Sequence, residues 1–301
     1  MKMPFCLTAN LVALCGILIV ATLENGAAAT ANLTSVADTT LQQGFPDYNF
    51  GIGATYTAGV RSKGGISRAL QRFDIAGAVP AGATINSVSL TVTVTASNGP
   101  NSTFELHRLL ASWGAGTGSD QGGSPALDGE ATWNDRFATN THWTVAGGAF
   151  SPTVSAAQTI TSVVNYTFTS AELAADVQAW LNNPAHNFGW LLRSEQESTL
   201  ATIRRFAGRT DIANPPLLTI QYTIAAPPTP PNLFNLAQVG NRIRFSFNGE
   251  SGRTYAVEFR DSLTTGTWNV LTNIPALPAN ATLHITNDIS PGPRFFRSRT
   301  P

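Results

Sequence analysis

Residues 170–194 join a helix pattern directly to a strand pattern, and this combination restricts the fold more than any other feature of the sequence. Thr169 can cap a helix, with Glu172 three residues later completing a capping box. Four apolar side chains follow on one helix face, at i, i+4, i+7 and i+8: Leu173, Val177, Trp180 and Leu181. Asn-Asn-Pro at 182–184 ends the helix, and apolar alternation over 188–192 predicts a strand directly after it.

Short alternating runs separated by turn residues dominate the rest of the chain. Over 87–96 the apolar residues Val88, Leu90, Val92 and Val94 face one way, and serine and threonine face the other. This pattern predicts a half-buried strand. Comparable runs occur at 69–75, 103–110, 202–206 and 217–222. Short strands at this spacing predict an all-β fold, a jelly-roll-like β-sandwich with one inserted α-helix.

The N-terminus has the pattern of a secretory signal peptide. Lys2 precedes an apolar run over 11–23, and three alanines at 27–29 supply a small-residue cleavage site. We expect a cut after Ala29, which makes 1–29 a signal peptide and the mature protein extracellular. The apolar run is shorter than the roughly 20 residues that cross a bilayer, so no membrane span is expected in the mature chain. Both cysteines lie in the leader, which leaves no disulfide for the mature protein.

A proline-rich stretch over 225–232 predicts a linker between two domains. The larger domain covers 30–224. The remaining 233–301 contain several alternating segments joined by turns, which predict a small second β-sandwich. Its Tyr-x-Val-Glu strand at 255–258, followed by Trp268, resembles the fibronectin-like or immunoglobulin-like modules that end many secreted bacterial proteins.

The order of short motifs in the larger domain is distinctive. These motifs are ADTTLQ at Ala37, ALQRFDI at Ala69, ELHRLLASWG at Glu105, DGEATWNDR at Asp128, and RRFAGR followed by PPLLTIQY. From about residue 32 to 223 the chain resembles the DNRLRE-domain proteins related to carbohydrate-binding module family 96, although the six-letter string that names them is absent. The resemblance implies a secreted, non-catalytic β-sandwich module, with acidic polysaccharides such as alginate among the ligands of some relatives.

The charge pattern argues against some partners. The formal net charge is zero, so a nucleic-acid or anionic-membrane partner lacks its main electrostatic attraction, and neither is expected. Basic charge after the leader is almost all arginine, with Lys63 the only lysine. Arginine suits bidentate contacts to carboxylates, either on a ligand or within the protein, and internal ion pairs are the expectation for most of them.

The sequence offers little for catalysis. The four histidines are scattered, without the spacing of a helical zinc pair. Asp128, Glu130 and Asp135 are carboxylates that could include a glycosidase acid and nucleophile, but proximity in sequence does not establish such a pair. No nucleophile and base stand out, so we expect that the protein is not an enzyme.

Sugar binding needs flat aromatic faces with polar groups at the rim. Residues 113–149 are rich in Gly, Ser, Asp and Asn and predict long loops over one end of the sandwich. Trp113 and Trp143 lie there and are our candidates for stacking on sugar rings. Trp133, Trp180 and Trp190 are interpreted as core. Arg204 and Arg205 are adjacent on a predicted strand, so one should reach solvent, where it could meet an acidic sugar, and the other should pair inside.

Calcium is a second candidate ligand. Asp47, Asn49 and Asp120 could supply oxygen ligands at a loop edge. The competing interpretation is a turn in which Asp and Asn bond their own backbone, and it is favoured because no twelve-residue calcium loop is present. No other cofactor is expected.

Together these patterns predict a secreted, non-catalytic protein that binds polysaccharide, acidic glycans included, at the cell surface or in the extracellular matrix. The alternative is a structural or adhesive envelope protein that binds other proteins, and a third hypothesis is a polysaccharide lyase or hydrolase. Exposed aromatic side chains discriminate the first two: a sugar platform needs coplanar rings in a groove, whereas a structural module buries its tryptophans.

Overall fold

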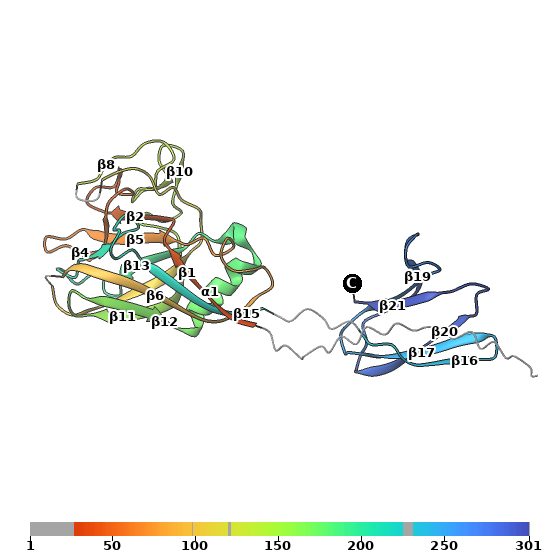
Figure 1. The fold of residues 1–301 in the computed structure, drawn as a ribbon. Helices are drawn as coiled ribbons and strands as arrows, with labels where there is room; N and C mark the ends of the chain where they lie inside the picture. The colour runs from red at the N-terminus through yellow and green to blue at the C-terminus, as the bar shows by residue number, and fades with distance from the viewer. Residues whose placement is uncertain (1–26, 98, 120–121, 225–230, 301) are drawn as a thin grey trace, which may run out of the picture. The chain divides into compact units, whose positions relative to one another are not determined.

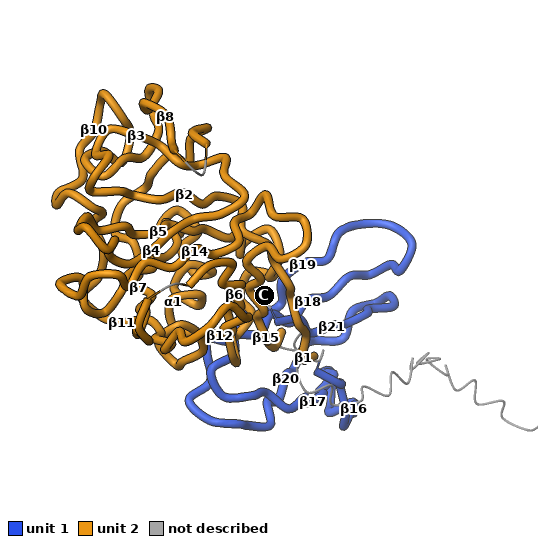
Figure 2. The backbone as a smooth tube through the Cα atoms, turned by 90° about the vertical axis from the view of Figure 1, so that its left-hand side faces the viewer, with its two compact units in different colours: residues 1–24, 226–301 blue, residues 25–225 orange. Residues whose placement is uncertain are grey.

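The computed structural model describes residues 27–97, 99–119, 122–224 and 231–300. The chain divides into two compact units, one within residues 25–225 and one within 226–301 (Figure 2). The predicted signal peptide, residues 1–29, lies almost wholly outside the described residues. Its last three alanines belong to the first strand, where they pair with Tyr222–Ile224. No described helix is long and apolar enough to cross a membrane.

The larger unit is an all-β sandwich with one α-helix, as predicted (Figure 1). Its strands follow one curled antiparallel path, in the order β1-β15-β6-β14-β4-β5-β13-β7-β11. The first layer contains β1 (Ala27–Thr34), β15 (Leu217–Ile224), β6 (Thr84–Ser97) and β12 (Asn165–Thr169), which pairs with β6. The second contains β2 (Ala37–Gln42), β5 (Ile66–Arg72), β13 (Trp190–Ser194), β7 (Ser102–Leu109) and β11 (Phe150–Ile160). Strands β14 (Arg204–Ala207) and β4 (Thr55–Val60) join the layers.

The main core lies between these layers, and the predicted alternation of β6 builds much of it. Val88, Leu90, Val92 and Val94 are all buried there, while the serines and threonines between them are half-buried or exposed. Since successive side chains of a strand point to opposite faces, the local pattern was enough to predict which face turns inward.

Helix α1 (Ala171–Asn182) closes one end of the core, where it packs against β6 and β11. The predicted face is confirmed, since Leu173, Val177, Trp180 and Leu181 are its buried residues. The predicted cap is wrong by one position: the Ser170 hydroxyl, not Thr169, accepts the Leu173 N–H at 2.8 Å. Trp180 meets Trp190 edge to face, with ring centroids 4.6 Å apart. A short 3-10 turn, η1 (Pro184–His186), follows the helix.

The smaller unit consists of two three-stranded antiparallel sheets. One contains β16 (Phe234–Val239), β17 (Arg242–Gly249) and β20 (Ala281–Asp288), and the other contains β19 (Asn269–Ile274), β18 (Tyr255–Arg260) and β21 (Phe295–Arg299). Phe245, Phe247, Tyr255, Val257 and Ile285 form its buried core. The predicted small second β-sandwich is therefore present, with its own hydrophobic centre.

One buried carboxylate makes the stability of the larger unit depend on pH. Asp38, in β2, is 3% exposed and forms an ion pair with Arg209 at 3.2 Å. Burial raises its pKa to about 6, and the hydrogen bond and charge of Arg209 only partly oppose this rise. Because the folded pKa exceeds the unfolded value, the folded state binds the proton more tightly. The resulting stabilisation is complete below pH 4 and is lost as the pH rises through 6.

We therefore expect the difference in unfolding free energy between the wild type and Asp38→Asn to fall by up to about 3 kcal/mol between pH 4 and pH 8. Urea unfolding of both proteins across this range measures it. The exposed Asp74→Asn is the matched control, because it removes a carboxylate from the surface of the same unit. A pH-independent difference for Asp38→Asn would contradict the expectation.

Candidate functional site

The two tryptophans predicted to stack on sugar rings are buried. Trp113 is 3% exposed and Trp143 is 5% exposed, so the prediction that their rings are available to a ligand is wrong. Their polar atoms are also paired inside the protein. The Trp113 Nε1–H donates to the Phe188 carbonyl at 2.8 Å, and the Trp143 Nε1–H donates to the Thr132 carbonyl at 2.9 Å. In this structure neither ring presents a face on which a sugar could stack.

These rings belong to a second hydrophobic core on the outer face of the second layer. Leucines of β2, β5, β13 and β7 contribute to it from the sheet, and Trp113, Trp133 and Trp143 contribute from the long loops. The loops carry two small sheets, β3 (Tyr48–Asn49) with β8 (Ser124–Pro125), and β9 (Asp135–Phe137) with β10 (Thr141–His142). Figure 1 shows β8 and β10 above β2, at the top of the larger unit. The interpretation of Trp133, Trp180 and Trp190 as core is confirmed, since all three are buried.

The glycines of this region explain why its composition suggested exposed loops. A Cβ added to Gly114 would lie 1.9 Å from the Gly129 carbonyl oxygen, and one added to Gly51 would lie 1.8 Å from that of Ala115. These glycines therefore permit close packing of one backbone segment on another. A composition rich in Gly and Asp is common to exposed loops and to such tightly packed segments, so it did not distinguish the two.

Arg204 and Arg205 point to opposite sides of β14, as predicted. Arg204 is fully buried, and its guanidinium donates to four carbonyl oxygens rather than to a carboxylate. These belong to Thr202 (3.0 Å), Ile203 (3.1 Å), Gly99 (3.4 Å) and Pro100. Burial lowers the pKa of this guanidinium. Arg204 thus ties two loops together and cannot meet a sugar, whereas Arg205 is half-exposed.

The proposed calcium ligands do not assemble into a site in the described residues. Asn49 is fully buried, and both ends of its amide are used: Nδ2 donates to the Ala115 and Ala131 carbonyls, and Oδ1 accepts the Gly51 and Gly118 N–H groups, all at 2.9–3.0 Å. Its oxygen is therefore a structural acceptor, and the prediction that it is a ligand is wrong. Asp47 is exposed and accepts a hydrogen bond from Asn134.

Asp120 lies outside the described residues. Among the residues that are described, no group of three or more His, Cys, Asp or Glu side chains could hold a metal ion.

The loop carboxylates considered for catalysis hold the loops together. Glu130 accepts the N–H and hydroxyl of Thr117 on one oxygen, at 2.7 and 2.8 Å, and the Leu127 N–H on the other, at 2.9 Å. Asp128 accepts the Thr139 hydroxyl, and Asp135 contacts His142. Each of these three carboxylates therefore contacts a different loop residue, and these contacts do not form a catalytic pair.

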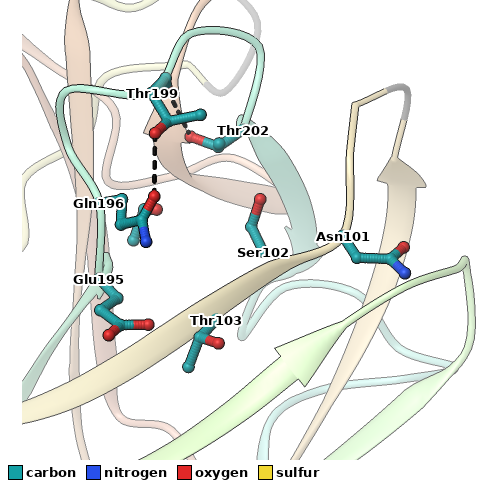
Figure 3. Close-up of a pocket in the computed structure, with 8 residues that line it drawn as sticks. Asn101, Ser102, Thr103, Glu195, Gln196, Thr199 and Thr202 are labelled. Carbon is teal, nitrogen blue, oxygen red and sulfur yellow. Dashed lines mark hydrogen bonds between the residues drawn. The ribbon is translucent and has the colours of Figure 1, made fainter.

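A polar pocket of about 140 Å³ lies between the start of β7 and the loop that follows β13 (Figure 3). Its lining residues are Asn101, Ser102, Thr103, Ser194, Glu195, Gln196, Thr199 and Thr202. Several of these groups bond one another, since Thr199 Oγ1 donates to Gln196 and Thr202 Oγ1 donates to the Thr199 carbonyl. The lining contains one carboxylate, so the carboxylate pair of glycosidase chemistry is not found there.

The first layer has an outer face that is hydroxyl-rich and uncharged. We call it the threonine face. It consists of the outward residues Thr30, Asn32 and Thr34 of β1, Leu217, Thr219, Gln221 and Thr223 of β15, Ser87, Ser89, Thr91 and Thr93 of β6, and Asn165, Thr167 and Thr169 of β12. Leu217 is its one large apolar side chain, and the small Ala28 lies opposite Thr223 at the end of β1.

Cross-strand hydrogen bonds order the threonine face. Thr91 pairs with Thr167 (2.9 Å), Thr93 with Asn165 (2.8 Å), Ser87 with Gln221 (3.0 Å) and Thr219 with Asn32 (2.8 Å). Neighbouring strands lie about 4.8 Å apart, so hydroxyl and amide groups repeat regularly across the face. The sequence showed serine and threonine on the polar side of 87–96, but only the pairing of four strands brings this chemistry together into a surface.

Comparisons with known proteins do not identify the chain. A scan against models of known protein families gives no match, and a search of curated proteins gives no significant match.

Proposed function

We propose that this chain is a secreted, non-catalytic module whose larger unit adheres to a neutral polysaccharide through the threonine face. The observation that carries the proposal is the absence of charge over four paired strands of that face. The signal-peptide pattern and the resemblance to carbohydrate-binding module family 96 support an extracellular glycan ligand. The buried tryptophans argue against the aromatic platform expected from the sequence, and therefore against recognition of single stacked rings.

The physical basis of such adhesion is a set of many weak, uncharged hydrogen bonds. Each hydroxyl can both donate and accept, so threonine and serine suit a ligand that itself presents hydroxyls. A typical hydrogen bond contributes only about 1 kcal/mol net, which makes repetition over a flat face necessary for affinity. Because the side chains already bond to one another, little rotamer freedom remains to be lost on binding.

The test is a pull-down of the mature protein with microcrystalline cellulose, chitin and an insoluble mannan. Arginine at the centre of the face, Thr219→Arg, places a long charged side chain on the flat surface and should lower binding by about tenfold or more. Thr159→Arg is the matched control. Thr159 lies on β11 of the opposite layer and has a similar cross-strand partner, Thr103 at 3.1 Å. It should leave binding within about twofold of the wild type.

A second candidate function is a structural or adhesive envelope protein that binds other proteins. It is favoured by the burial of all five tryptophans of the larger unit, the property expected of a structural module. The same experiment decides between the two. If none of the three polysaccharides retains the wild type, or if Thr219→Arg and Thr159→Arg bind equally, the glycan proposal fails and the structural function replaces it.

A further inference from the structure

The smaller unit carries arginine in excess over carboxylates. From residue 231 to the C-terminus there are seven arginines, no lysine and four acidic residues, which gives a formal charge of +3 in a chain of zero net charge. This imbalance disappears in the overall composition because the larger unit carries the opposite excess. A basic surface on the smaller unit would attract an anionic partner.

The charge gathers on the outer face of the sheet β19-β18-β21. Tyr255 and Val257 of β18 point into the core, so Glu258 and Arg260 point outward. Opposite Glu258 on β21 is Arg297, and Arg299 lies two residues further on the same side. We call Arg260, Trp268, Arg297 and Arg299 the Arg–Trp strip.

Contacts link the members of the strip into a continuous row. The Arg260 and Arg297 guanidiniums lie 4.9 and 4.3 Å from the centroid of the Trp268 ring. The Nε–H of Arg297 donates to one carboxylate oxygen of Glu258 at 2.7 Å, and the Nε–H of Arg299 donates to the other at 2.8 Å. Trp268 is also the only one of the six tryptophans that is not buried. An aromatic side chain and arginines therefore come together on this sheet, whereas the sequence analysis placed its candidate tryptophans in the long loops of the larger unit and its candidate arginines on a strand of that unit.

The strip has a net positive charge, and part of that charge is exposed to solvent. Hydrogen bonds from Arg299 and Arg297 lower the pKa of Glu258, so this carboxylate stays ionised and offsets only one of three guanidiniums. The Arg297 and Arg299 side chains are 46% and 51% exposed. Alternate residues of a strand lie about 6.8 Å apart, so these two arginines can meet successive acidic groups along a polymer.

We propose that the Arg–Trp strip is a second binding site, which takes an acidic polysaccharide whose carboxylates bind the exposed guanidiniums. The net positive charge of this face favours an anionic partner, and the spacing of Arg297 and Arg299 along the strand favours a polymer with repeated carboxylates. The site is independent of the proposed function of the larger unit, and it would let one molecule hold an acidic and a neutral polymer together.

The experiment is affinity electrophoresis of the whole mature protein in gels that contain polygalacturonate, with dextran as the neutral control. The wild type should be retarded by polygalacturonate, and the retardation should weaken as salt is raised. Arg299→Gln should weaken binding at least about fivefold, since a charge-assisted bidentate contact is lost. Arg244→Gln is the matched control: Arg244 is an exposed arginine on β17 of the other sheet, and its loss should change binding less than twofold.

Glu258→Gln provides a change of opposite sign. Removal of the one negative charge in the row should tighten binding roughly 3- to 5-fold at low salt. Failure of the wild type to be retarded by polygalacturonate, equal effects of Arg299→Gln and Arg244→Gln, or weaker binding by Glu258→Gln would each overturn the proposal. Thr219→Arg should leave retardation by polygalacturonate unchanged, so a failure of the threonine face and a failure of this site give different results. Thermal melting of each variant verifies that it is folded.

Discussion

Alanine in place of Trp143 is expected to lower the free energy of unfolding of the larger unit by about 3–5 kcal/mol. The ring is 5% exposed within the second core, and its Nε1–H donates to the Thr132 carbonyl. The substitution therefore leaves a cavity in an apolar cluster and removes a buried hydrogen bond at the same time. Trp113→Ala should behave similarly, because Trp113 has the same burial and an equivalent bond to Phe188.

Urea unfolding measures these losses, and Trp180→Ala provides the reference for a tryptophan in the main core. If Trp143→Ala unfolds like the wild type but loses affinity for polysaccharide, the ring is accessible in solution and the aromatic platform becomes the better account. Equal losses of stability for the three variants would support two cores of comparable packing.

Methionine in place of Arg204 is expected to destabilise the same unit by about 2–4 kcal/mol. Arg204 is fully buried and is the donor for carbonyl oxygens of two separate loops, at 99–100 and 202–203. Methionine keeps much of the aliphatic stem but leaves these acceptors without their donor, which is costly for a carbonyl shielded from water, such as that of the buried Thr202.

The neighbouring Arg205→Met supplies the control within the same strand. Arg205 is half-exposed, so its replacement should change the unfolding free energy by no more than about 0.5 kcal/mol. Equal losses of unfolding free energy for the two variants would show that the difference in burial between Arg204 and Arg205 does not determine the destabilisation. A loss for Arg204→Met alone would establish that this arginine is structural.

Local periodicity was sufficient to predict most of the elements. The alternation of β6, the apolar face of α1 and the apolar strand after it all depend on residues within a few positions of one another. The misplaced helix cap is a similar case. Thr169 and Ser170 can both cap a helix by composition, and the backbone of Ser170 decides, because its hydroxyl reaches the Leu173 N–H.

The all-β class, the inserted helix and the inward faces of the strands could therefore be predicted from the residues alone, because each follows from a repeat along the chain. Which side chains of the long loops are exposed, and which surfaces remain uncovered, depends instead on how the chain folds back on itself. Trp113 and Trp143 are buried because the loops fold back on the second layer, and the threonine face forms because strands distant in sequence pair side by side. Both results arise from contacts between distant segments, which local composition does not encode.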